Sequence, residues 1–68
     1  MADFTLRELQ GFRYALTPHN DKAKAWIRGH IGEEQSWLGQ ALFIEHARYA
    51  QEILSGIRAD GLTVEIIL

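Results

Sequence analysis

The stretch Ala41-Leu42-Phe43-Ile44-Glu45-His46 decides the fold of this 68-residue chain. As a buried strand it makes the protein a small α/β domain. As the middle of one helix over residues 33–58 it makes the protein all-helical, and Trp37, Ala41 and Ile44 would then share a face. Against the helix, Gly39 would interrupt its second turn, and three consecutive large apolar residues exceed a single helix stripe. We therefore predict a strand over residues 41–46.

The segments on either side support this choice. Residues 12–16 and 62–68 alternate bulky apolar residues with smaller or polar ones, which is typical of strands. Ala23, Trp26 and Ile27 have the spacing of one helix face, and Thr17-Pro18 resembles a helix start, so we predict a helix over residues 18–30. A second apolar stripe predicts a helix over residues 47–59. Gly61 is suited to the left-handed position that ends it.

Residues 4–10 have two readings. Thr5 and Glu8 match a capping box, and Gly11 could end a one-turn helix. Alternatively, Phe4 starts a strand and Gln10-Gly11 turns a hairpin into Phe12. We favour the hairpin, because an additional strand would cover an otherwise exposed sheet edge.

These elements predict one α/β (α+β) domain over residues 1–68. It is a small two-layer sandwich in the order β-β-α-β-α-β, with a three- to four-stranded sheet and both helices on one face. Strand periodicity then divides the side chains between the faces. The face under the helices is expected to hold Phe12, Tyr14, Leu16, Leu42, Ile44, Leu62, Val64, Ile66 and Leu68. The open face is expected to hold Arg13, Ala15, Ala41, Phe43, Glu45, Thr63, Glu65 and Ile67.

The open face is the predicted interaction surface, because apolar groups rimmed by charges are a mark of association sites. A chain this short has a small core and gains much from association. Trp37 could be an additional interface anchor or could cover the edge of the core. The predicted interface residues are Phe43, Ile67, Ala15, Arg13, Glu45, Glu65 and Trp37.

No motif that carries chemistry is present in the sequence. The three histidines, His19, His30 and His46, fall on different elements, and no cysteine is present, so we predict neither a metal nor a cofactor. Ser36 and Ser55 have no nucleophile elbow around them, and the glycines do not group as a phosphate-binding loop. We therefore predict no catalytic residues and no enzyme activity.

The composition narrows the class of partner. Seven Lys and Arg against nine Asp and Glu give a net charge of −2, so nucleic-acid binding is not expected. No apolar run reaches the length of a membrane span, and the N-terminal residues lack signal-peptide features, so a cytoplasmic protein is expected. The leading hypothesis is a non-enzymatic module that associates with itself or with another protein, as an accessory or inhibitor protein would. The alternatives are an acidic mimic that inhibits a nucleic-acid-binding machine and a metal- or ligand-binding subunit.

Overall fold

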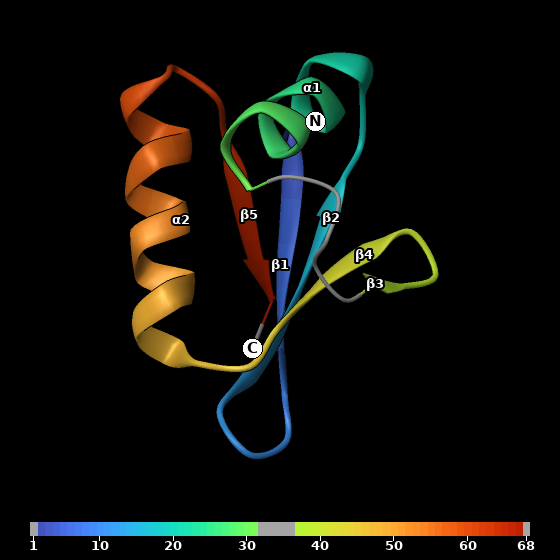
Figure 1. The fold of residues 1–68 in the computed structure, drawn as a ribbon, viewed down its shortest axis with the longest axis vertical. Helices are drawn as coiled ribbons and strands as arrows, with labels where there is room; N and C mark the ends of the chain where they lie inside the picture. Colours follow the sequence, from blue (N-terminus) through green and yellow to red (C-terminus); the bar gives the residue numbers. More distant parts are fainter. Residues whose placement is uncertain (1, 32–36, 68) are drawn as a thin grey trace.

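The computed structural model describes residues 2–31 and 37–67, and it folds into a sheet covered on one face by two helices (Figure 1). The elements in chain order are β1 (Phe4–Leu9), β2 (Arg13–Pro18), α1 (Asp21–His30), β3 (Trp37–Leu38), β4 (Ala41–Ile44), α2 (Ala47–Ala59) and β5 (Val64–Ile67). The predicted α+β class is confirmed. One helix follows the N-terminal hairpin and the other lies between β4 and the last strand, as predicted.

The sheet has five strands in the order β3-β4-β2-β1-β5, not three or four. The additional strand is β3, which pairs antiparallel with β4 through Trp37 and Leu42. This strand is not predicted from the sequence, because two residues are too few to show alternation. The β1–β5 pair is parallel, and β1–β2 and β2–β4 are antiparallel. Helix α2 therefore carries the chain from β4 across the sheet to the far edge (Figure 1).

The deciding stretch is a strand, as predicted. Strand β4 spans Ala41–Ile44, where Leu42 and Ile44 are 0% and 1% exposed. The strand ends two residues earlier than expected because His46 is the N-cap of α2. The all-helical alternative is therefore excluded.

The N-terminal hairpin is also confirmed, but its turn differs from the prediction. Leu9 pairs with Arg13, so residues 10–12 form the loop. Gly11 and Phe12 both have positive φ, at 74° and 62°. Phe12 is 75% exposed, and its predicted position on the covered face is wrong. A bulky residue in the left-handed region is disfavoured by its own Cβ, so period-two alternation gives no sign of this turn.

Helix α1 begins later than predicted. Asn20 is the N-cap, and its side-chain Oδ1 accepts a hydrogen bond from the Ala23 backbone N–H at 2.8 Å. Pro18 does not occupy the first turn of the helix, because it ends strand β2 opposite Phe4. Thr17-Pro18 suits a helix start locally, but pairing with β1 extends the strand through both residues.

Helix α2 has the predicted bounds and the predicted end. Gly61 has φ of 81°, and the Leu62 N–H donates to the Ile57 carbonyl at 3.1 Å, which closes the last turn. The last strand begins at Val64, and the predicted Leu68 lies outside the described residues.

The core fills the space between the two layers. Register places Tyr14, Leu16, Leu42 and Ile44 on one face of the sheet, together with Phe4 and Leu6 of β1. Helix side chains pack on that face: Ala23, Trp26 and Ile27 from α1, and Ala50, Ile53 and Ile57 from α2. The opposite face of the sheet is covered by neither helix and is named the open face below.

Candidate functional site

One continuous row of side chains crosses the open face. Arg7 of β1 pairs with Ile67 of β5 on one side and with Ala15 of β2 on the other, and Ala15 pairs with Phe43 of β4. The row therefore reads Ile67–Arg7–Ala15–Phe43 across four neighbouring strands. Directly paired residues of a sheet point to the same face and lie in contact distance, so these four form one surface strip.

Three of the four residues of the strip are apolar, and Arg7 is the exception. Ile67 is 37% exposed, and Phe43 is half-buried with no helix above it. Between them lie the exposed Arg7 and the small Ala15. Threonines flank the row, because Thr5 pairs with Thr17 and also with Glu65.

Six of the seven predicted interface residues lie on or beside the open face. Ala15, Phe43 and Ile67 share the strip, Glu65 lies two residues before Ile67 on the same face of β5, and Arg13 pairs with Leu9 at the other end of the face. Glu45 follows β4 directly and is exposed. The structure thus brings together residues from both ends and the middle of the chain.

Arg7, at the centre of the strip, was missed by the sequence analysis. The sequence offers two readings of residues 4–10, of which the hairpin is favoured, and no face is predicted for Arg7. The signal was present, because Phe4 and Leu6 alternate with Thr5 and Arg7. A period-two reading of this segment would have placed Arg7 opposite the core.

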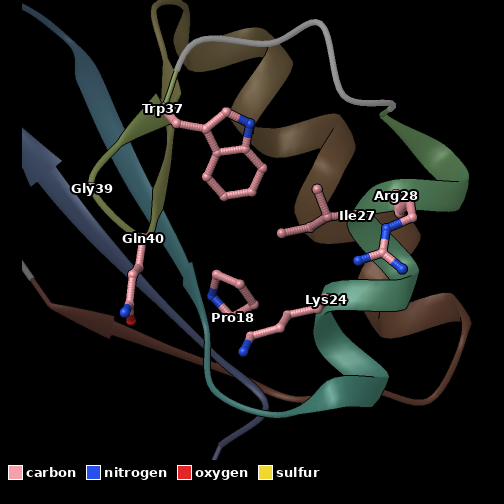
Figure 2. A pocket seen from close by; sticks show the side chains of 7 residues that line it. All are labelled: Pro18, Lys24, Ile27, Arg28, Trp37, Gly39 and Gln40. Carbon is pink, nitrogen blue, oxygen red and sulfur yellow. The ribbon is translucent and has the colours of Figure 1, made fainter.

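Trp37 lies apart from the other predicted interface residues. It pairs with Leu42, whose side chain is buried under the helices, so Trp37 faces the helix side of the sheet. There it borders a cavity of about 360 Å³ between α1 and the β3–β4 hairpin, lined also by Pro18, Lys24, Ile27, Arg28, Gly39 and Gln40 (Figure 2). The indole is 41% exposed, so it is not core.

A polar cluster joins the end of α1 to the end of α2. The Trp26 indole Nε1–H donates to Asp60 Oδ2 at 2.7 Å, and His30 Nε2 lies 3.2 Å from the same oxygen. The His30 ring stacks on Trp26 with ring centres 4.3 Å apart. The two contacts to Asp60 connect α1 to the end of α2, whereas the stacking of His30 on Trp26 lies within α1.

Metal-binding groups do not gather anywhere in residues 2–31 and 37–67: no set of three or more His, Cys, Asp or Glu is placed to hold an ion. His19 Nε2 lies 2.6 Å from Thr5 Oγ1. In the sequence, His19 is well separated from both His30 and His46.

Asp3 forms a second polar cluster, where the chain enters β1. Its carboxylate accepts hydrogen bonds from the Asn20 side chain at 2.8 Å and from the Thr63 backbone N–H at 3.0 Å. These two bonds, with Lys22 at 3.8 Å, lower the pKa of the Asp3 carboxyl below its ordinary value. The cluster ties the starts of β1, α1 and β5 together, which is a structural role.

Comparison with known proteins returned no match to a family model, to a curated protein or to a solved structure. Within the part of the chain that the structure describes, neither helix is long and apolar enough to cross a membrane.

Proposed function

We propose that the chain is a non-enzymatic protein-interaction module whose open sheet face associates with a second copy of itself. The observation that carries the proposal is the row Ile67–Arg7–Ala15–Phe43, which has an apolar residue at each end. The small size of the domain adds support, because a short chain gains stability by covering such a face.

The order of residues in the row suits a two-fold symmetric contact. An axis parallel to the strands, between β1 and β2, exchanges the two halves of the row. Ile67 of one copy then meets Phe43 of the other, twice, and Arg7 meets the small, uncharged Ala15. No charged side chain of the row faces a like charge. Aligned packing of two sheets, with about 30° between strand directions, is a common arrangement.

The test is the solution mass over a range of protein concentrations, by sedimentation. We expect the wild-type chain to dimerise and Phe43→Asp to be monomeric, because a carboxylate would be buried against Ile67 of the second copy. Gln51→Asp, on the exposed side of α2, is the matched control and should still dimerise. A wild-type chain that stays monomeric at the highest attainable concentration would contradict the proposal.

A second variant tests the orientation. Ala15→Arg would place an arginine against Arg7 of the second copy, and we expect it to weaken the dimer as Phe43→Asp does. Its own unfolding curve must show that the monomer still folds. If the dimer tolerates Ala15→Arg but not Phe43→Asp, the open face remains the interface. The two-fold arrangement described above would then be excluded.

The other functions expected from the sequence receive less support. The acidic mimic needs clustered carboxylates, and among the described residues Glu52 lies on α2 while Glu65 lies on the open face. A different protein as partner of the same face is the main competing reading, and a monomeric chain with a binding partner lost on Phe43→Asp would favour it. The cytoplasmic location stays a prediction.

A further inference from the structure

Strand β5 forms one edge of the sheet, and none of the strands that the structure describes lies beyond it (Figure 1). An edge strand presents unpaired backbone N–H and C=O groups, and proteins commonly guard such an edge with lysine, proline or a very short strand. The opposite edge is guarded in this way, because β3 has only two residues. Strand β5 has four, and its sequence Val64-Glu65-Ile66-Ile67 contains neither lysine nor proline. The β5 edge is therefore the one suited to accept another strand.

The hydrogen bonds to β1 indicate which backbone groups of β5 point outward. The Phe4 N–H donates to the Thr63 carbonyl at 3.1 Å, and Phe4 is the register partner of Val64. In a parallel pair, a residue bonds to the two residues that flank its partner, so every second residue of the neighbouring strand turns its backbone groups away. Glu65 therefore faces β1, and Val64 and Ile66 present their N–H and C=O groups at the free edge.

The side chains along this edge include accessible apolar groups on both faces of the sheet. Ile66 is the partner of Leu6 and shares its face, yet Ile66 is 44% exposed whereas Leu6 is 4% exposed. The helix layer thus does not close over the outer side of β5 at Ile66. On the open face, Ile67 is 37% exposed. Addition of a strand would remove apolar surface from water on both faces, besides pairing the backbone.

The charge pattern of β5 favours a second copy of β5 as the added strand and selects its register. Two copies related by a two-fold axis pair antiparallel, and the centres that keep most of the strand paired are Glu65 and Ile66. A centre at Glu65 places two carboxylates directly opposite each other, which is destabilising. A centre at Ile66 places Ile66 against its own copy, and Glu65 lies beside the aliphatic Ile67 of the copy on both sides. The outward N–H of each Ile66 then donates to the C=O of the other.

We infer that β5 pairs edge to edge, antiparallel, with β5 of a second copy, with the two Ile66 residues at the centre. The contact does not rest on the open-face contact proposed above, because it lies in the plane of the sheet and uses backbone groups. It contains few hydrogen bonds, so it is the weaker of the two contacts and forms at the high protein concentrations used for NMR. A chain that uses both contacts forms assemblies larger than a dimer.

The first test is disulfide cross-linking, because the chain contains no cysteine and a single introduced thiol reports on this contact alone. Directly opposed, hydrogen-bonded residues have Cα atoms about 5.5 Å apart, within the range of about 4.4–6.8 Å that a disulfide spans. We expect Ile66→Cys to form an intermolecular disulfide about tenfold faster than Ile67→Cys, since a thiol held beside its partner reacts at a raised effective concentration. Ile67→Cys is the matched control, because the two copies of residue 67 are then diagonal neighbours about 7–8 Å apart. Equal rates would overturn the pairing.

The second test is amide hydrogen exchange followed by NMR, in the wild-type chain and in Phe43→Asp, which removes the open-face contact. We expect exchange at the Ile66 N–H to slow relative to the Ile67 N–H as the protein concentration rises, because only Ile66 gains a partner. The same slowing in Phe43→Asp would support the edge contact even if the open-face dimer fails. A face-to-face dimer leaves the Ile66 N–H unpaired at the edge. A ratio of exchange rates that is independent of concentration would therefore overturn the edge contact and leave the proposed function standing.

Discussion

The two faces of the sheet differ in how far they are buried, although the same strands build both. On the covered face, Leu42 and Ile44 of β4 are almost fully removed from solvent, and both helices pack there. On the open face, Phe43 of the same strand is only half-buried, and its neighbours in the row are Ala15 and Arg7. The covered face therefore supplies the buried apolar core of the fold, and the open face leaves Phe43 partly accessible to solvent.

The largest effect on stability is expected from two neighbouring residues of β4, one on each face. Leu42→Ala should lower the free energy of unfolding by about 2–5 kcal/mol, because it leaves a cavity in a closed core. Phe43→Ala should lower it by less than half of that, because water or a partner replaces the lost contacts. Denaturant unfolding at low protein concentration measures both without a contribution from association. Equal losses would mean that the open face is as tightly packed as the core.

The next test concerns the polar contacts that hold the helix layer. Asp60→Ala should cost about 1–3 kcal/mol, because it removes the acceptor of the nearly buried Trp26 indole N–H. The partial exposure of Asp60 places the expected value in the lower half of that range. Glu52→Ala, an exposed carboxylate on α2, is the control and should change stability by no more than about 0.5 kcal/mol. The measurement is thermal or denaturant unfolding. If Asp60→Ala lowers the free energy of unfolding no more than Glu52→Ala does, the cluster does not stabilise the protein.

A smaller effect of opposite sign is expected at the hairpin tip, outside both faces. Phe12→Gly should raise the free energy of unfolding by about 0.5–1 kcal/mol, because glycine adopts the positive φ of 62° without a steric penalty. Phe12→Ala keeps the Cβ and should show no such gain. If glycine destabilises the protein, the exposed ring has contacts that outweigh the backbone strain.

The smallest effect is the pH dependence of the Asp3 cluster. Because folding lowers the pKa of Asp3 below 3.8, its contribution to stability is complete above that pH and is lost as the pH falls through the folded-state pKa. The stability difference between wild type and Asp3→Asn should therefore be largest at neutral pH and shrink below pH 3.8. Unfolding curves across this range check it, and a difference that is constant with pH would contradict the assignment.

Several parts of the fold and of the candidate site were predictable because they depend on local spacing. The existence of the strand that begins at residue 41, the bounds of α2 and the left-handed Gly61 follow from local sequence pattern and backbone freedom, although the strand ends at residue 44 and not at 46. Alternation also placed Ala15, Phe43 and Ile67 on one face. The turn at Phe12 and the start of α1 at Asp21 were not predictable in this way, because strand pairing overrides the local preferences of Phe12, Thr17 and Pro18.

The sequence by itself determined the alternation that separates Leu42 and Ile44 from Phe43, since side-chain direction in a strand is a property of the backbone. Only the tertiary structure decided that Arg7 completes the row between Ile67 and Ala15, because strand order and register depend on contacts between distant segments. The same holds for Trp37, whose pairing with Leu42 turns it away from the open face and toward the cavity beside α1.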